Sequence, residues 1–169
     1  KILYECQSLD YVLLGESERT LPQLLSEVSL NGGVNLGRVD GLVYRENSRV
    51  INNGKKYFID DLDNLPYPAR DLIDIQRYMN TKSVLCGLGS RPALSLLTSR
   101  SCPHHCSFCN MWLVHGSRWR ARSPENVLGE VDEIVNKYQA KQVFIMDDNF
   151  TFDIERAKNI CNKIIQKGY

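Results

Sequence analysis

The chain has 169 residues, with 21 Lys or Arg against 20 Asp or Glu, so its formal net charge is +1. A charge so close to balance argues against a nucleic-acid-binding domain that works through bulk positive charge. Hydrophobic residues make up 43% of the chain, enough for a buried core. The chain has no run of about 18 consecutive apolar residues, so no membrane-spanning helix is predicted. The length fits one domain or parts of two.

The N-terminal half predicts a strand, a helix and several short strands. Residues 10–15 form an apolar run ending in glycine, typical of a buried strand. Thr20 is the expected N-cap of a helix that stops at residues 31–33. A strand followed by a helix indicates the tail of a doubly wound α/β domain. The apolar stripe of this helix comprises Leu21, Leu24, Leu25 and Val28.

The next segment has a different character. Residues 41–45 and 49–51 predict two strands around a turn, with residues 56–59 as a candidate third strand. Residues 61–90 are interpreted as a linker between domains, because Pro66 and Pro68 favour extended backbone before them. A plain surface loop fits the same pattern.

The last eighty residues alternate strand and helix. Strands are expected at 93–98 and 142–146, and each is followed by a helix. Ser123 is the expected N-cap of the first helix, with Pro124 at its first position, and Asp153 is the expected N-cap of the second. This order makes the two strands parallel neighbours joined by a right-handed crossover. The apolar stripe of the first helix comprises Val127, Val131, Ile134, Val135 and Tyr138. The apolar stripe of the second helix comprises Ala157, Ile160, Cys161, Ile164 and Ile165.

Three of the six cysteines, Cys102, Cys106 and Cys109, fall within eight residues. This crowding favours metal or cluster ligation in a reducing compartment over a secreted disulfide framework. Three thiolates would leave one iron of a 4Fe-4S cluster open to a substrate or cofactor. Cys86 and Cys161 are interpreted as small buried hydrophobic residues. Cys6 is a third isolated cysteine.

Two other interpretations of the cysteine loop compete. Zinc in a Cys3His site would take its fourth ligand from one of the three histidines, His104, His105 or His115. A ferredoxin-like electron carrier is disfavoured because no fourth cysteine stands nearby.

Acidic and amide side chains follow the second predicted strand, at Asp147, Asp148 and Asn149. Because parallel strands end at one edge of a sheet, this turn and the cysteine loop should converge there. The structural alternative is that Asp147 or Asp148 only caps or bonds loop amides. One of the arginines of this region could pair with an anionic group, although a solvated loop face is the favoured interpretation for each. They are Arg118, Arg120 and Arg122.

The CxxxCxxC spacing after a strand, with an aromatic residue before its last cysteine, resembles the radical S-adenosylmethionine (radical SAM) superfamily. Residues 98–100, 120–125 and 144–151 resemble the branch with an N-terminal cobalamin-binding domain, and residues 15–18 and 65–71 extend that resemblance. The family pattern commonly has Gly where this chain has Ser17 and Ser101.

The resemblance implies an α/β fold. Residues 91–169 would form the first two βα units of a partial TIM-like radical SAM barrel. Residues 1–60 would be the end of a Rossmann-like cobalamin-binding domain with its exit strands. Because a barrel needs more strands than these two, we expect the isolated chain to be inactive.

The resemblance also implies a chemistry. Cys102, Cys106 and Cys109 would bind three irons of a 4Fe-4S cluster, whose fourth iron would chelate SAM and cleave it to a 5'-deoxyadenosyl radical. Phe108 would lie by the adenine. The alternative is that Phe108 is a core residue that anchors the loop. The acidic turn, Asp147 to Asn149, would meet the amino group of the methionine moiety.

For partners, the resemblance implies an electron donor such as flavodoxin or ferredoxin and a small-molecule substrate that the sequence does not identify. It implies a cytoplasmic enzyme with no nucleic-acid partner and no membrane span. Cobalamin and methyl transfer are implied by the family alone, because the DxHxxG signature for an axial histidine does not occur in this sequence.

Overall fold

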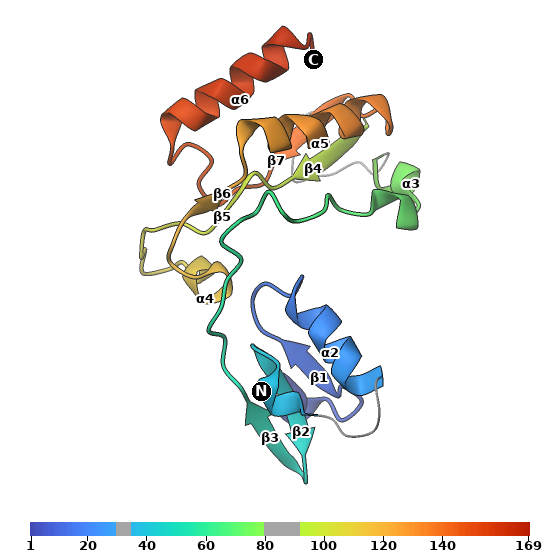
Figure 1. Ribbon diagram of the computed structural model, residues 1–169, viewed down its shortest axis with the longest axis vertical. Coiled ribbons are helices and arrows are strands. Elements are labelled where there is room, and N and C mark those ends of the chain that lie inside the picture. Colours follow the sequence, from blue (N-terminus) through green and yellow to red (C-terminus); the bar gives the residue numbers. More distant parts are fainter. Residues whose placement is uncertain (30–34, 80–91) are drawn as a thin grey trace. The chain divides into compact units, whose positions relative to one another are not determined.

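The computed structural model describes residues 1–29, 35–79 and 92–169 (Figure 1). The chain forms two compact units. Unit 1 comprises residues 1–60 and 103–117, and unit 2 comprises residues 61–102 and 118–169. The segment after Cys102 therefore belongs to unit 1, although the strands on either side of it belong to unit 2. In the described part of the chain, no helix combines the length and the apolar composition that crossing a bilayer requires.

Unit 1 is built on a three-stranded antiparallel sheet of order β1-β2-β3 (Figure 1). Its strands are β1 (Tyr11–Leu13), β2 (Leu42–Glu46) and β3 (Arg49–Asn52). Asn47 and Ser48 make the predicted hairpin turn, both with positive φ, as a two-residue hairpin loop of the primed type requires. The remaining elements are α1 (Ile2–Glu5), α2 (Thr20–Ser29), η1 (Leu36–Arg38) and α4 (Met111–His115).

Helix α2 confirms the predicted helix but differs from it in detail. Thr20 is the first helical residue rather than the cap, and its hydroxyl has no hydrogen-bond partner among the described residues. Leu24 packs into the core of unit 1, whereas the rest of the predicted stripe is exposed. Strand β1 is only partly buried, contrary to expectation. The predicted stop at residues 31–33 lies outside the described residues.

The candidate third strand at residues 56–59 is wrong, because that segment forms no strand. Its amides bond to carboxylates instead of a neighbouring strand. Lys56 and Tyr57 donate their N–H groups to Asp40, at 2.9 and 3.3 Å, and Ile59 donates to Glu16 at 2.8 Å. Side-chain acceptors that satisfy these amides, of which that of Ile59 is buried, remove the need for a ladder partner.

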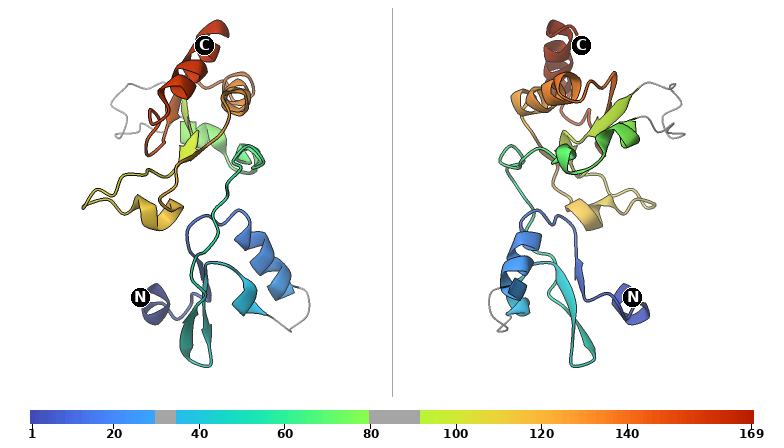
Figure 2. Two further views of the ribbon diagram at one scale, coloured as in Figure 1. Left: turned by 60° about the vertical axis from the view of Figure 1, so that its left-hand side comes forward. Right: turned by 90° about the vertical axis from the view of Figure 1, so that its right-hand side faces the viewer.

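Unit 2 confirms the predicted alternation of strand and helix. Strand β4 (Ala93–Leu96) pairs in parallel with β7 (Gln142–Ile145), with Leu94 opposite Val143. Helices α5 (Pro124–Asn136) and α6 (Ile154–Gln166) pack against each other and share one core with these strands (Figure 2). A short antiparallel pair, β5 (Ser99–Arg100) with β6 (Arg120–Ala121), lies beyond the end of β4.

The two predicted helix caps of unit 2, Ser123 and Asp153, are confirmed. The Ser123 hydroxyl accepts the Asn126 N–H at 3.1 Å, and the Asp153 carboxylate accepts the Arg156 N–H at 2.9 Å. These bonds satisfy amides that the first helical turn leaves without partners.

The interpretation of Cys161 as a buried residue is wrong, because its side chain is exposed on α6. Ile160 faces the core, and the next residue along a helix is turned by about 100° away from it. Ile165 is exposed for the same reason, one position beyond Ile164. Cys86 lies outside the described residues.

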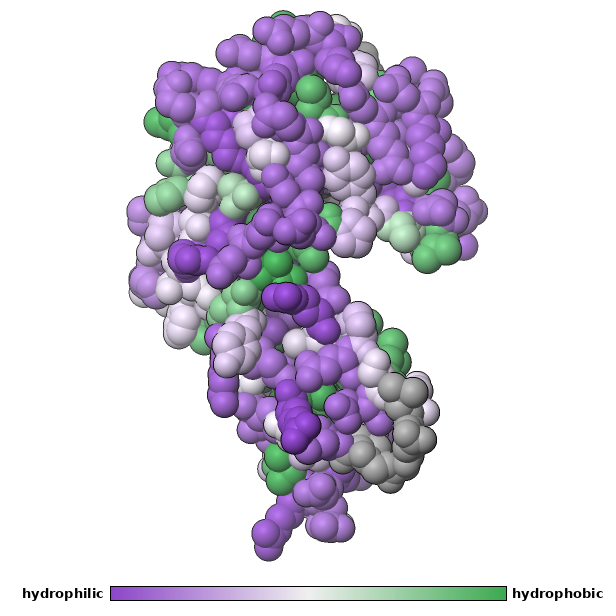
Figure 3. Space-filling model, in the orientation of Figure 1, coloured by the Kyte–Doolittle hydropathy of each residue, from purple (hydrophilic) through white to green (hydrophobic). Residues whose placement is uncertain are grey.

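Residues 61–79, the described part of the expected linker, form what we term the strap. It contains η2 (Arg70–Leu72) and α3 (Ile75–Met79) and is bonded to the N-terminal end of α5 within unit 2. The Tyr67 hydroxyl donates to the Asn126 carbonyl at 2.8 Å, and the Asp63 carboxylate accepts the Ser123 N–H at 2.8 Å. The face of the molecule drawn in Figure 3 is mostly hydrophilic.

Candidate functional site

The cysteine loop leaves unit 2 directly after β5. Cys102 and Cys109 are half-buried, Cys106 is exposed, and all three are free thiols. The Cys109 N–H donates to the Cys106 carbonyl at 3.0 Å, which forms a turn between the second and third cysteine. Within residues 1–29, 35–79 and 92–169, no three Cys, His, Asp or Glu side chains already stand together as a metal-ligand group. The donor set, three unpaired thiols within eight residues, fits an iron–sulfur cluster.

Ser101, the residue before the first thiol, has a φ of 72° and no exposed surface. This left-handed conformation favours glycine, because a Cβ crowds the backbone there. The position is one where the family pattern commonly has Gly, and the backbone geometry supplies the physical reason. The turn into the loop is therefore kept despite the serine.

Asp147 holds the carboxyl ends of the two parallel strands together. Its carboxylate accepts three hydrogen bonds, from the Thr98 N–H at 2.6 Å, the Thr98 hydroxyl at 2.5 Å and the Ser99 hydroxyl at 2.6 Å. Thr98 and Ser99 lie just before the cysteine loop and have almost no exposed surface. Asp147 therefore has the loop-bonding geometry that the structural alternative described.

The rest of the acidic turn faces the loop or solvent. The Asn149 side-chain amide donates to Cys102 Sγ at 3.7 Å, and the Asn149 backbone carbonyl accepts the Trp119 indole N–H at 3.2 Å. Asp148 is exposed. The predicted convergence of this turn with the cysteine loop is thus present for its first thiol, at the carboxyl edge of β4 and β7.

Phe108 is 90% exposed, so it is not a core residue that anchors the loop. The histidines have other surroundings. His105 packs against Trp112 with ring centroids 5.8 Å apart, and His115 Nδ1 lies 3.5 Å from Glu16 Oε1. His104 is exposed.

The expectation of a solvated face is wrong for two of the three arginines. Arg118 is exposed, but Arg120 is buried in the β5–β6 pair. Arg122 ion-pairs with the buried Glu130 and donates to the Leu97 carbonyl at 2.8 Å. These bonds tie the return from the cysteine loop to the end of β4.

Glu130 is a site residue that the sequence analysis missed. Its side chain is 1% exposed and lies between Arg122 and Arg70 of the strap, whose guanidinium nitrogen is 2.5 Å away. Arg70 also donates to the Ser95 carbonyl of β4 at 3.0 Å. A carboxylate on the apolar stripe of α5 was the available signal, because a charge on a buried helix face needs a partner.

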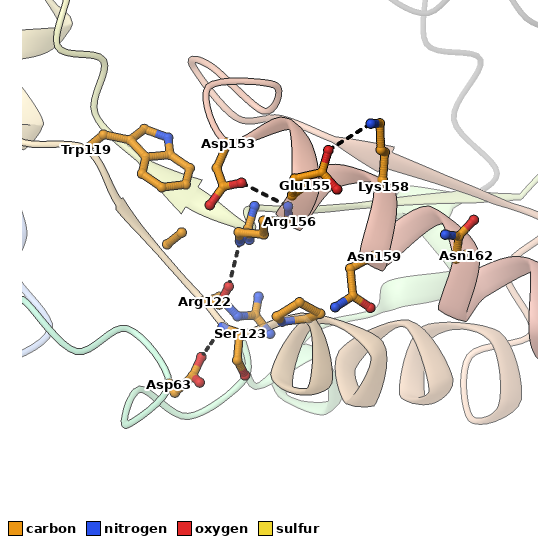
Figure 4. A pocket seen from close by; sticks show the side chains of 12 residues that line it. Asp63, Trp119, Arg122, Ser123, Asp153, Glu155, Arg156, Lys158, Asn159 and Asn162 are labelled. Atoms are coloured by element: carbon orange, nitrogen blue, oxygen red, sulfur yellow. Dashed lines mark hydrogen bonds and ion pairs between the residues drawn. The ribbon is translucent and has the colours of Figure 1, made fainter.

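Arg156 of α6 completes this polar layer. It donates to the carbonyls of Arg122 at 2.8 Å and Thr98 at 2.7 Å, and its guanidinium lies over the Trp119 ring, 5.7 Å from the centroid. Burial lowers the pKa of Arg156. Arg156 also lines an open pocket of about 880 Å³ beside the first turns of α5 and α6 (Figure 4).

The charges that line this pocket are largely paired within the fold. Asp153 caps α6, and Lys158 lies 2.8 Å from Glu155. The close-up shows Arg156 between Asp153 and Arg122 (Figure 4). The pocket therefore has no strong excess of either charge.

Comparison with known proteins gives the site a context. The profile of the Radical SAM superfamily matches residues 96–168. The chain is 35% identical over 164 residues to an uncharacterized methyltransferase of Pyrococcus horikoshii, covering 97% of this chain and 34% of the relative. It is 30% identical over 184 residues to cytidylyl-2-hydroxyethylphosphonate methyltransferase of Streptomyces wedmorensis, covering 95% and 34%. The chain spans about a third of the length of the curated relatives it matches.

A solved structure confirms the expected fold. The radical S-adenosylmethionine methyltransferase TsrM from Kitasatospora setae, solved with cobalamin and a [4Fe-4S] cluster, superposes with a TM-score of 0.72 at 18% identity. The match covers 98% of this chain and 31% of TsrM. The matched profile begins at Leu96, the last residue of β4, and contains the cysteine loop and all of β7. Residues 96–168 of the chain therefore carry the domain of the Radical SAM superfamily.

Proposed function

We propose that Cys102, Cys106 and Cys109 hold a 4Fe-4S cluster whose open iron binds SAM in the protein that carries this chain. The observation that carries the proposal is the position of the loop, whose first thiol meets Asn149 at the carboxyl edge of the parallel strands. When bound, the cluster would supply the electron that cleaves SAM to a 5'-deoxyadenosyl radical.

The residues around the loop would prepare it for this task. Asp147 holds Thr98 and Ser99, so the strand end that leads to Cys102 is fixed before any ligand binds. The Asn149 side-chain N–H donates to the Cys102 sulfur and would stabilise negative charge on a thiolate. Such preorganisation reduces the reordering that ligand binding would otherwise require.

Two exposed residues are proposed to contact SAM. The exposed carboxylate of Asp148 suits an ammonium donor. Phe108 offers an exposed aromatic face that suits stacking on adenine. Asp147 is a weaker candidate for the ammonium, because its carboxylate already accepts three hydrogen bonds.

For the whole protein we propose methyl transfer to a small molecule with the help of cobalamin and an electron donor. The names of the two relatives above as methyltransferases, and the cobalamin bound in TsrM, support this reaction class. In this proposal residues 1–60 are the end of a cobalamin-type domain and residues 91–169 the start of the barrel.

Iron and sulfide analysis after anaerobic reconstitution tests the ligand assignment. Replacing any one of Cys102, Cys106 and Cys109 by alanine should abolish cluster assembly. Cys6→Ala and Cys161→Ala are matched controls, because both thiols are exposed and neither belongs to the loop. Equal iron loss in the controls would contradict the assignment, and zinc without sulfide would favour the structural zinc module.

A further inference from the structure

Helix α4 begins two residues after Cys109 and docks on the Gly15–Glu16 turn within unit 1. The docking is close enough to exclude a side chain. Gly15 has a φ of 65°, and a Cβ built there would lie 2.7 Å from the Val114 carbonyl oxygen. Real Cβ atoms do not approach backbone oxygen so closely, so α4 can reach this turn only because residue 15 is glycine.

The side chain of Glu16 also contacts α4, at its last residue, His115. The residue is 4% exposed. One carboxylate oxygen accepts the Ile59 N–H at 2.8 Å, and the other lies 3.5 Å from His115 Nδ1. The Glu16 carbonyl accepts a hydrogen bond from Lys55 Nζ at 2.9 Å, which holds the turn itself. The carboxylate therefore links the segment leaving the sheet of unit 1 to the end of α4.

The residue after α4 makes a third close contact. Gly116 has a φ of 73°, and a Cβ there would lie 3.2 Å from the Phe58 ring. Phe58 immediately precedes Ile59, whose N–H is held by Glu16. Turn, exit segment and helix end thus form one packed group in unit 1.

Helix α4 is too short to be stable without this docking. Helix α4 has five residues. Isolated helices shorter than about 12–15 residues are marginal in water, so α4 depends on tertiary contacts to stay folded. The only covalent path from α4 back to Cys106 is the short turn through Cys109. An ordered α4 therefore restricts the positions of the second and third thiols, Cys106 and Cys109.

We infer that the Gly15–Glu16 turn is the receptor for helix α4, and that Gly15 and Glu16 are positioning residues for the loop that carries Cys106 and Cys109. This gives a physical role to the first part of the segment 15–18. The role in positioning thiols rests on the proposed function, whereas the docking of α4 is independent of it.

Hydrogen exchange on the metal-free intact protein tests the docking. Gly15→Ala should raise the exchange of amides in residues 111–116 by about tenfold or more. Gly54→Ala is the matched control, because Gly54 has a φ of 70° and nothing within 4 Å of a built Cβ. Both variants strain the backbone equally, but only the first displaces α4. Equal exchange in the two variants would overturn the inference.

Glu16→Gln and His115→Asn keep the test decisive if Gly15→Ala folds poorly. The glutamine retains an acceptor for the Ile59 N–H but removes the charge facing His115. We expect each single variant to raise exchange of the same amides by about threefold and the double variant to add little, as for one shared interaction. Additive effects, or none, would overturn the pairing.

Iron retention after reconstitution tests the consequence for the thiols. Gly15→Ala should lose its cluster faster than both the wild type and Gly54→Ala. Faster exchange in α4 with unchanged iron retention would overturn the positioning role while leaving the cluster assignment intact. A wild-type protein that assembles no cluster would refute the proposed function, and the exchange result would still decide whether α4 docks on this turn.

Discussion

Glu130→Gln is expected to destabilise unit 2 strongly, because it neutralises a carboxylate shared by two guanidinium groups. The Glu130 side chain is 1% exposed, and those of Arg70 and Arg122 are 6% and 11% exposed. Three different segments meet here: the strap, the return from the cysteine loop and helix α5. Loss of the charge affects all three at once.

The magnitude follows from which partner is removed. Breaking a buried ion pair by removing one charge typically costs about 3–5 kcal/mol, because the other charge stays buried without compensation. The glutamine oxygen can still accept a hydrogen bond from one guanidinium, so we expect about 3 kcal/mol. Stability of a typical domain is about 5–15 kcal/mol, so this loss is a large fraction of it.

Urea denaturation of the intact protein, followed by circular dichroism, measures this loss. Glu133→Gln is the matched control on the same helix, because its side chain is 24% exposed and pairs with Lys137 across one turn. Exposed pairs of this kind contribute about 0.3–0.5 kcal/mol. A Glu130→Gln loss as small as that of Glu133→Gln would refute the reasoning that the Arg–Glu–Arg group holds the strap to α5.

Ser101→Gly should stabilise the protein by about 0.5–1 kcal/mol, since it relieves a left-handed serine, and thermal unfolding would show a raised midpoint. Asn149→Ala should lower the midpoint potential of the proposed cluster by on the order of tens of millivolts in a redox titration, because an N–H donor to sulfur favours the reduced state; an unchanged potential would contradict this. Hydrogen bonds from Tyr169 and Lys167 lower the pKa of Asp132, so its contribution is present above the ordinary carboxyl pKa and is lost as pH falls below about 4. Asp132→Asn should therefore flatten the acid side of the stability profile.

The parts of the fold that the sequence predicted well are those with local causes. The two parallel strands are short apolar runs, and the caps of α5 and α6 are a serine and an aspartate placed before a helical stripe. Each feature is encoded within a few residues, so the local sequence pattern is sufficient to predict it.

The parts that the sequence did not predict depend on contacts between distant segments. Residues 56–59 have a strand-like pattern, but the carboxylates of Asp40 and Glu16 take their amides. Arg70 and Glu130 are sixty residues apart, and nothing local links them. The width of the buried face of α6 was also not evident: Ile160 and Ile164 pack in the core as predicted, whereas Cys161 is exposed.

The candidate site divides in the same way. The three loop cysteines are evident from their spacing, and the parallel order of β4 and β7 brings the acidic turn to the first of them. The division of work within that turn was not evident. Only the structure shows that Asp147 bonds Thr98 and Ser99 while Asn149 meets the thiol.

The proposed function requires that the open iron of a cluster held by the cysteine loop binds SAM. Electron paramagnetic resonance of the reduced, reconstituted intact protein tests it most directly, with spectra recorded before and after SAM is added. We expect SAM to change the spectrum of the wild-type protein. We also expect Asp148→Ala to require roughly tenfold more SAM for the same change, as for loss of about 1.4 kcal/mol in binding. A cluster whose spectrum is unchanged by saturating SAM would contradict SAM binding at the open iron and favour an electron carrier.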